Sequence, residues 1–428
     1  MMAIIMLFIA LALLGVGIPV AFVFGGAALA AALLSPEIGL EVFNVLPFRI
    51  YGIMSNSTLM AVPLFILMGL LLERSGTAEK LLIAMTSMFG TLKGGLAVSV
   101  VLVGAILAAT MGIVSASVVM MSLIALPLMI RAGYSKELSS GTIAASGTLG
   151  QIIPPSVILI ILGDVMNISV GDLFAGAMLP GLLLVALYII YIVVIAHLKP
   201  HMAPPLRDED HHGSFVSLVW AITPMLLLMI IVLGSIFSGI ASPSESAAFG
   251  VIGALIISLL NKTLTRTMLR QSLRETLKLS GMIFMILIGA TAFSLVFNEL
   301  GGTDQIIEFF GNNVSSAWMF IFIAMLVIFI LGFFIDFIEI SFIIVPILLP
   351  VMHAYGIDPL WFAILIAMNL QTSFLTPPFG LSLFFVKGAA GDSVTSGQIY
   401  RGIIPFVLLQ IVALALVMSF PNLVFSFV

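Results

Sequence analysis

The chain has 428 residues, of which 62% are hydrophobic and 8% are charged, and its mean hydropathy is +1.31. Because a soluble domain carries about 25% charged residues, this composition excludes a water-soluble globule and indicates an integral membrane protein. The net charge of −4 is too small to indicate a nucleic-acid partner. The absence of cysteine excludes disulfides, thiolate metal sites and cysteine nucleophiles.

Long uncharged stretches follow one another along the chain, and most of them are long enough for a membrane-spanning helix of about 20 residues. They are residues 1–36, 50–72, 94–130, 138–163, 173–198, 211–244, 279–298, 309–335, 359–386 and 402–428. Strands of a membrane barrel would be about 10 residues long with alternating polarity, so we predict an all-α polytopic protein. The first stretch is interpreted as a retained membrane segment rather than a signal peptide, and Gly15, Gly17 and Pro19 could divide it into two helices.

Three less apolar segments, 76–92, 262–278 and 303–314, mix polar and apolar residues at helical spacing. This pattern predicts helices that lie along the membrane interface, where the five basic residues of 262–278 would contact anionic lipid headgroups. If the stretches 94–131 and 316–353 each enter and leave on one side, every Lys and Arg except Arg49 falls on the same face. Basic residues mark the cytoplasmic side, so the C-terminus is expected in the periplasm.

Histidines offer little support for a metal site. His197, His201, His211 and His212 fall in the polar segment 197–212, and His353 stands apart. The polar segment is interpreted as a solvated loop, because no carboxylate and histidine spacing places ligands on one helical face. The chain also lacks a phosphate-binding glycine loop, HExxH and GxSxG, so an enzyme is not predicted.

The chain contains an internal repeat. Residues 144–162 (AASGTLGQIIPPSVILIIL) align with 367–385 (AMNLQTSFLTPPFGLSLFF) at an offset of 223, which pairs the two Pro-Pro sequences. Residues 125–134 align with 348–357 at the same offset. Five predicted crossings separate equivalent points, so the second copy is predicted to be inverted, and inverted repeats with interrupted helices are typical of secondary transporters.

The paired prolines predict two broken transmembrane helices. Each proline removes one helical hydrogen bond and frees a carbonyl oxygen, and Thr148, Gln151, Ser373 and Thr376 add polar groups near the breaks. Such oxygens are tolerated at bilayer depth where protein, water or a ligand satisfies them. A sodium ion, which prefers oxygen donors, is the predicted ligand, and a simple proline kink is the alternative.

Two long apolar stretches, 94–131 and 316–353, predict re-entrant helical hairpins whose tips reach mid-membrane. The first tip, TMGIVSAS (110–117), carries hydroxyls rather than a polar loop, and the second, GFFIDFIEIS (332–341), carries Asp336 and Glu339. A carboxylate in the membrane costs about 2.5–3.5 kcal/mol on insertion scales and is a functional candidate by default. A hydrogen bond between the hairpin arms is the alternative for one of the two, and Asp336 is the stronger candidate.

Several motifs resemble the large membrane subunit of tripartite ATP-independent periplasmic (TRAP) transporters. They are GTLGQIIPPS (147–156), SPSESAAFG (242–250), GFFIDFIEISFIIVPILLPV (332–351) and GIDPLWFAILIAMNLQTSFLTPPFGLSLF (356–384). The tip TMGIVSAS departs from the more usual Gly-Ser-Ser of the family. The resemblance implies an elevator-type, sodium-coupled transporter of the bacterial inner membrane, which imports an organic acid anion such as a C4-dicarboxylate. It also implies a small membrane subunit and a periplasmic substrate-binding protein as partners, and no cofactor besides Na⁺ as the coupling ion.

The resemblance further implies two sodium sites and a substrate site. The sodium ligands would be Thr110, Gly112, Gly150, Ile153 and Ser156 at the first break, and Gly332, Ser373, Thr376 and Phe379 at the second. The substrate candidates are Ser115, Ser117, Gln151, Asp336, Asn369 and Gln371. Because residues 316–386 contain no Lys or Arg, helix N-termini and bound sodium would hold the anion.

The expected division has a mobile unit formed by 94–170 and 316–390, and a scaffold formed by 1–93, 171–315 and the C-terminal helix in 391–428. The alternative function is a stand-alone sodium- or proton-coupled symporter or antiporter with a related inverted-hairpin fold, which would need no binding protein. A channel is disfavoured because no helix carries a continuous polar stripe, and an intramembrane protease because Asp336 lacks a second membrane aspartate in a partner motif.

Overall fold

The computed structural model describes residues 1–36, 38–112, 114–206 and 215–428, and every regular element in these ranges is a helix. The first half contains α1 (Met2–Gly15), α2 (Val20–Leu34), η1 (Leu40–Val45), α3 (Leu46–Met54), α4 (Ala61–Arg74), α5 (Thr77–Phe89), α6 (Gly95–Met111), α7 (Val114–Arg131), α8 (Lys136–Thr148), η2 (Leu149–Gln151), α9 (Val157–Met166), α10 (Val170–Leu198) and η3 (Pro200–Met202). The second half contains α11 (Phe215–Phe237), α12 (Pro243–Leu260), α13 (Arg266–Glu299), α14 (Gly302–Asn313), α15 (Ala317–Leu331), α16 (Phe337–Glu339), η5 (Ile340–Ile344), α17 (Val345–Ala354), α18 (Pro359–Leu375), α19 (Leu381–Ala390), η6 (Gly391–Ser393), α20 (Ser396–Ser419) and α21 (Asn422–Phe425).

The prediction of a helical membrane protein is confirmed. Seven of the described helices are long and apolar enough to cross a bilayer, and α4 with α5, bent by 59°, would make an eighth. The N-terminal stretch forms two helices, α1 and α2, with the break at residues 16–19. In the polar segment 197–212, His197 and His201 are exposed, whereas His211 and His212 lie outside the described residues.

The structure differs from the prediction at 262–278. Residues 76–92 and 303–314 contain separate short helices, α5 and α14, but the third segment is continuous with the apolar stretch that follows it in α13. This helix has 34 residues and begins at Arg266, after the N-cap Thr265, whose side chain accepts a hydrogen bond from the Met268 amide. Residues 266–280 contain neither proline nor glycine, so nothing in the sequence ends the helix before the span. The prediction of a separate interfacial helix at 262–278 is therefore wrong.

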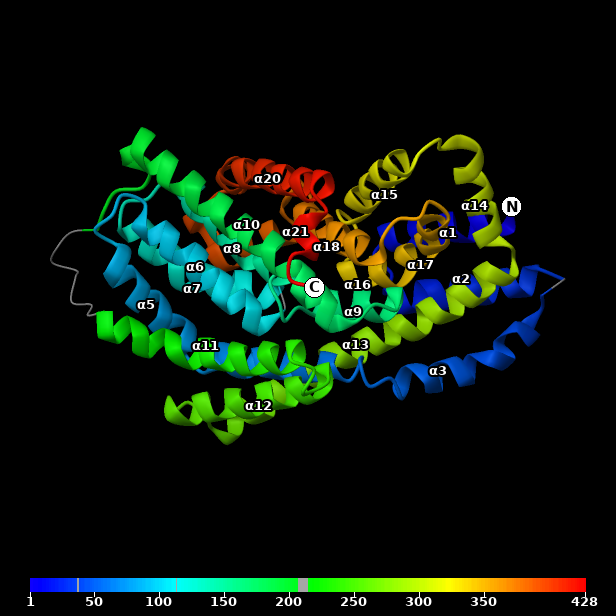
Figure 1. Cartoon of the computed structure of the whole chain (residues 1–428), viewed down its shortest axis with the longest axis horizontal. Helices are drawn as coiled ribbons and strands as arrows, with labels where there is room; N and C mark the ends of the chain where they lie inside the picture. The colour runs from blue at the N-terminus through cyan, green and yellow to red at the C-terminus, as the bar shows by residue number, and fades with distance from the viewer. Residues whose placement is uncertain (37, 113, 207–214) are drawn as a thin grey trace.

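The helices pack in two groups. The first group is built around α2, α4, α12 and α13, with α11 against α12. The second is built around the hairpin α6–α7, the broken helices α8–α9 and α18–α19, and the long helices α10 and α20. Figure 1 shows α11, α12 and α13 along one side of the molecule and α8, α10, α18 and α20 on the other. α10 and α20, which fall in the predicted scaffold, pack against α8, α9 and α18 of the predicted mobile unit. The mobile unit itself stays a prediction.

Glycine allows the closest approach between helices of the second group, as small residues commonly do in membranes. A Cβ atom on Gly141 of α8 would lie 2.2 Å from the carbonyl oxygen of Gly402 in α20. A Cβ on Gly402 would lie 1.9 Å from the carbonyl oxygen of Glu137. Backbone therefore meets backbone where α20 crosses the first broken helix.

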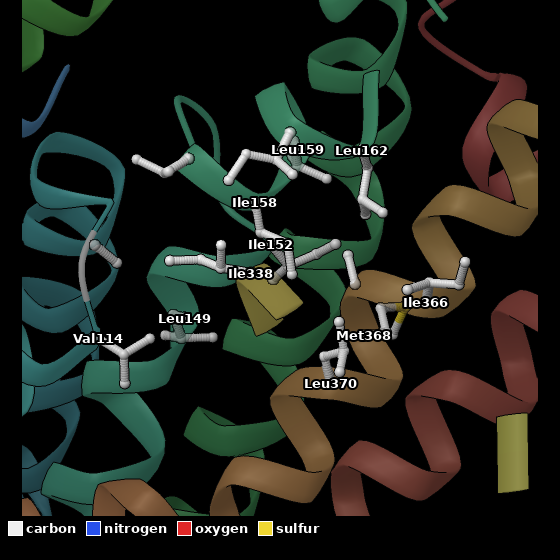
Figure 2. Close-up of a cluster of buried hydrophobic side chains, with 14 of the residues drawn as sticks. Val114, Leu149, Ile152, Ile158, Leu159, Leu162, Ile338, Ile366, Met368 and Leu370 are labelled. Carbon is white, nitrogen blue, oxygen red and sulfur yellow. The ribbon is translucent and has the colours of Figure 1, made fainter. Parts of the chain in front are cut away.

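Both predicted helix breaks are present. α8 gives way through η2 to a non-helical segment that ends where α9 begins at Val157, and α18 ends before α19 begins at Leu381. The Pro154–Pro155 and Pro377–Pro378 peptide bonds are both cis. Figure 2 shows side chains of the first broken helix, of α18 and of Ile338 meeting in one apolar cluster. The two copies therefore share a core.

Equivalent positions of the two copies also contact each other directly. The Nε2 atom of Gln371 donates to Oγ1 of Thr148 at 3.5 Å, and these residues are 223 positions apart, which is the offset of the repeat. Both are buried between α8 and α18. Equivalent positions of two repeats face each other where they lie near an approximate two-fold axis. Thr148 and Gln371 therefore lie close to the axis that would relate the two copies.

Candidate functional site

A cavity of about 160 Å³ lies where the two hairpin tips, the two helix breaks and the first helix group meet. Its walls come from α4, α13, the tips of both hairpins, and the segments on either side of each break. The lining residues are Ile66, Gly112, Val114, Ser115, Gln151, Val157, Leu279, Met282, Ile283, Asp336, Phe337, Ile338, Phe374, Leu381 and Phe385. None of them is Lys, Arg or His, and Asp336 is the only charged one.

Four helices begin at this cavity. Val114, Val157, Phe337 and Leu381 are the first residues of α7, α9, the continuous helix Phe337–Ala354 and α19, and all four line the wall. The first amides of a helix have no intrahelical acceptor, and the helix dipole makes that end positive. The N-caps of α9 and α19 form no side-chain capping bond. An anion in the cavity would therefore meet helix N-termini without any basic side chain.

The candidate residues of the first sodium site lie around the first break. Gly112, at φ +60°, ends α6 in the left-handed region that favours glycine, and a Cβ there would lie 3.5 Å from the Val157 nitrogen and 3.7 Å from the Pro155 oxygen. A Cβ on Gly150 would lie 3.1 Å from the Ala108 oxygen. The first tip therefore rests on the first break, with main-chain oxygens close by.

The remaining candidates for the first sodium site are the hydroxyl residues Thr110 and Ser156 and the apolar residue Ile153. The Thr110 hydroxyl donates to the Leu107 carbonyl at 2.9 Å, and the Ser156 hydroxyl donates to the Gln151 carbonyl at 2.7 Å. Each hydroxyl oxygen retains lone pairs for a cation. Ile153 is half-buried, and a Cβ on Gly181 of α10 would lie 3.0 Å from its side chain.

The candidate residues of the second sodium site lie around the second break. A Cβ on Gly332 would lie 2.2 Å from the Ser373 hydroxyl, so the second tip touches the second broken helix. Ser373 and Thr376 donate to the carbonyls of Leu370 and Thr372, both at 2.8 Å. Phe379 is 46% exposed, and its ring centroid lies 5.2 Å from that of Phe334 in the tip.

The structure separates the substrate candidates into two sets. Ser115, Gln151 and Asp336 line the cavity, whereas Ser117, Asn369 and Gln371 do not. Asn369 is buried and donates to the Met325 carbonyl of α15 at 2.7 Å, so it joins α18 to an arm of the second hairpin. Gln371 donates to Thr148.

Two polar groups of the lining are distinctive. Asp336 caps the helix that it precedes, because its Oδ1 accepts the Phe337 amide at 2.7 Å. Gln151 is 2% exposed, and neither atom of its amide has a hydrogen-bond partner among the described residues. Buried polar groups are normally paired, so this amide is suited to a ligand in the cavity.

Several lining residues were not predicted from the sequence. Phe337, Phe374 and Phe385 supply aromatic surface from the second hairpin, from α18 and from α19. Ile66 of α4 and the trio Leu279, Met282 and Ile283 of α13 supply the opposite wall. The spacing of the trio marks one helical face, but apolar faces are common throughout this chain, so the pattern alone could not single this one out.

One side-chain pair joins the two helix groups beside this region. The Nδ2 of Asn56, between α3 and α4, donates to Oδ1 of Asp164 in α9 at 2.5 Å. Among the described residues, the one ion pair joins Arg74 of α4 to Glu275 of α13, within the first group.

Comparison with known proteins identifies the family. Residues 5–423 match the family described as the tripartite ATP-independent periplasmic transporter, DctM component. The chain belongs to this family. The resemblance to the large membrane subunit of TRAP transporters is thereby confirmed, and the chain is the large permease subunit of a secondary transporter that depends on a substrate-binding protein. It is a multi-pass protein of the bacterial inner membrane.

The relatives differ in their substrates. The C4-dicarboxylate TRAP transporter large permease protein DctM of Pseudomonas aeruginosa is 31% identical over 381 residues, covering 88% of this chain and 87% of the relative. The sialic acid large permease protein SiaM of Vibrio cholerae is 30% identical, covering 96% and 95%. The ectoine large permease protein TeaC of Halomonas elongata is 28% identical, covering 86% and 85%. The family thus leaves the substrate of this chain open.

A solved structure shares the fold. The YdaH transporter of Alcanivorax borkumensis superposes with a TM-score of 0.66 over 99% of each chain, at 14% sequence identity. At this identity the likeness shows the fold alone. It agrees with the all-helical membrane architecture described above.

Proposed function

We propose that this chain is the membrane-embedded transport subunit of a sodium-coupled importer of an organic acid anion, working by an elevator mechanism. The anion, a C4-dicarboxylate or another carboxylate, would be delivered by a periplasmic binding protein, and a small membrane subunit would complete the scaffold. The observation that carries the proposal is the convergence of helix N-termini on one cavity without a basic side chain, two of which, those of α9 and α19, have no side-chain cap. Such termini bind a carboxylate group.

Sodium coupling is supported by the surroundings of the cavity. Each tip rests on one break, at Gly112 and Gly332, where main-chain and hydroxyl oxygens gather. A sodium ion at either contact would join a tip to a broken helix and order both. Sodium and anion would then strengthen each other's binding by the same factor.

The elevator mechanism is supported by the two packing groups. The mobile unit would include the hairpins and broken helices together with α10 and α20, since these pack against one another. The wall from α4 and α13 would belong to the scaffold. Movement across that wall would carry the cavity between the two sides of the membrane.

The proposal is tested by transport. The chain, co-purified with its small subunit, would be reconstituted in vesicles with its binding protein and a radiolabelled acid. Uptake should require an inward sodium gradient and the loaded binding protein, and a potassium gradient of equal size should give none. Uptake driven by sodium without a binding protein would favour the stand-alone symporter, and uptake driven only by protons would contradict sodium coupling.

A further inference from the structure

A second cavity lies beside the cavity between the hairpin tips, which is called the inner cavity below. It has a volume of about 200 Å³ and is lined by residues of α3, α9, α13 and the continuous helix Phe337–Ala354. Among its described lining residues Arg49 is the one basic residue, whereas the inner cavity has none, and it is called the Arg49 cavity. We propose that the Arg49 cavity is an external anion subsite, where the guanidinium of Arg49 binds the carboxylate of the substrate before the substrate enters the inner cavity. This inference rests on the proposed function and deepens it.

The two cavities follow the same helices. On α13, Ile283 lines the inner cavity, and Leu287 and Ser294 line the Arg49 cavity. Their positions place the three side chains on one helical face, and Ile283 and Ser294 lie about 16 Å apart along the helix axis. α9 and the helix Phe337–Ala354 also begin at the inner cavity and contribute residues to the Arg49 cavity farther along. The cavities therefore lie in series along the contact between α13 and the second hairpin.

The basic residues of α13 indicate on which side of the membrane the Arg49 cavity lies. Four of them fall within residues 266–278, immediately before the inner-cavity residue Leu279, and basic residues mark the cytoplasmic side. Ser294 lies nearer the other end of the helix, at Glu299, and Arg49 is the one Lys or Arg predicted on the periplasmic face. An anion that enters from the periplasm would therefore meet the Arg49 cavity before the inner cavity.

The Arg49 side chain is available to a ligand. It is exposed and has neither an ion-pair nor a hydrogen-bond partner among the described residues. The carboxylate in the same cavity, that of Asp164, accepts a hydrogen bond from Asn56 at 2.5 Å instead. A guanidinium group presents a planar fork of donors that matches a carboxylate. The substrate carboxylate can therefore bind first at Arg49 and then at the helix N-termini of the inner cavity.

The charge of Asp164 limits how tightly an anion binds in the Arg49 cavity. Because like charges repel, this carboxylate opposes an anion beside Arg49, which suits a subsite that must pass its ligand on. Asp164→Asn keeps an oxygen for the Asn56 amide but removes the repulsion. This substitution should therefore strengthen anion binding, whereas Arg49→Gln should abolish it.

Protection of a thiol tests the inference. The chain contains no cysteine, so Ser294→Cys introduces a single reactive group at a half-buried position of the lining. The variant, co-purified with a cysteine-free small subunit, would be labelled with an uncharged maleimide at constant ionic strength. Succinate should slow labelling saturably, by about threefold or more, whereas its uncharged analogue succinamide should not, because only a carboxylate pairs with the guanidinium. Ser238→Cys, exposed just after α11 and outside both linings, is the control and should show no protection.

Variants in the Ser294→Cys background identify the groups responsible. Arg49→Gln should abolish protection by succinate, and Arg49→Lys, which keeps the charge without the planar fork, should retain part of it. Asp164→Asn should lower the half-protecting concentration of succinate by about threefold. Lys278→Gln, which removes an exposed basic charge outside both linings, should leave that concentration unchanged.

The choice of salt separates this inference from the proposed function. None of the described residues that line the Arg49 cavity is a sodium candidate, so succinate should protect equally in sodium and potassium chlorides. Protection that requires sodium would show that succinate acts from the inner cavity; the proposed function would then stand while the inference falls. Absence of protection by succinate, or full protection in Arg49→Gln, would also overturn the inference. Protection in both salts, together with uptake that needs no sodium gradient, would uphold the inference while sodium coupling fails.

Discussion

The two helix breaks share a cis Pro-Pro bond but have very different surroundings. At the first break, Pro154, Pro155 and Ser156 are all buried. At the second, the equivalents of the last two, Pro378 and Phe379, are exposed, and the Phe379 ring lies tilted against that of the exposed Phe334 in the neighbouring tip. In an inverted repeat, equivalent elements exchange their environments when the transporter changes sides. Under the proposed elevator mechanism, this difference would correspond to one state of the cycle, in which the second break is open and the first is closed.

The closest backbone approach in the second helix group lies at the crossing of α8 and α20. Gly402→Ala places a Cβ against the Glu137 carbonyl, and backbone cannot move aside as a side chain can. We expect a loss of about 3 kcal/mol or more in unfolding free energy, or no folded protein. Gly176→Ala in α10, where a Cβ would meet the Val424 side chain at 3.0 Å and that of Leu360 in α18 at 3.6 Å, should cost less than about 1 kcal/mol. Thermal unfolding in detergent measures both, and equal stability of the two variants would contradict this role of the α8–α20 crossing.

At the second break, the second tip packs closely against α18, where Gly332 meets the Ser373 side chain. Gly332→Ala should destabilise the protein by about 1–3 kcal/mol, because the added methyl group meets the Ser373 side chain. Gly332→Ala combined with Ser373→Gly should recover most of the packing loss, which a double-mutant cycle in thermal unfolding would detect. Additive losses would show that the tip does not rest on Ser373.

Thiol labelling compares the two breaks directly. The chain contains no cysteine, so single substitutions give no background. Phe379→Cys, at a position 46% exposed, should react with a membrane-impermeant maleimide at least about tenfold faster than Ser156→Cys, the equivalent position at 0% exposure. Equal rates in detergent would show that the two breaks do not differ in solution.

The smallest expected effect concerns the pair Asn56 and Asp164. Asn56→Ala removes the hydrogen bond between the two helix groups, worth about 0.5–1.5 kcal/mol, together with the two bonds that Asn56 Oδ1 accepts from the Thr58 and Leu59 amides. If this bond favours the state with the second break open, labelling of Ser156→Cys should become several-fold faster in the Asn56→Ala background. Thr58→Ala, which alters a neighbouring side chain outside this hydrogen bond, is the matched control. An unchanged rate would mean that the pair stabilises both states alike.

The sequence predicted the parts of the site where proline, glycine or a polar residue interrupts a long apolar stretch. Paired prolines marked the breaks, glycine and hydroxyl residues marked the first tip, and Asp336 marked the second. These features interrupt long apolar helices, and an interruption at bilayer depth requires a compensating partner. The convergence of helix N-termini followed from the same interruptions.

Other parts of the site depend on how helices far apart in the sequence pack together, and the sequence did not predict them. Asn369 and Gln371 were both assigned to the substrate, yet residues two apart on a helix point about 200° from each other, and neither lines the cavity. The walls from α4 and α13 are apolar like most of the chain. Asn56 and Asp164 are 108 residues apart and carry no motif. The sequence did not predict that α13 is one continuous helix, because the change from polar to apolar residues at 279 was interpreted as the boundary between two helices.

Sodium-dependent stability tests the central claim most directly. A ligand that binds only the folded state raises its stability by RT ln(1 + [L]/Kd), or about 2.7 kcal/mol at 100 times Kd. Thermal unfolding of the chain with its small subunit would be followed in sodium, potassium and choline chlorides at equal ionic strength. We predict a saturable rise specific to sodium, weakened by Gly150→Ala at the closed break and by Ser373→Ala at the open one, and unchanged in Ser139→Ala, a buried α8 hydroxyl outside both sites. The absence of any sodium-specific rise would contradict the account.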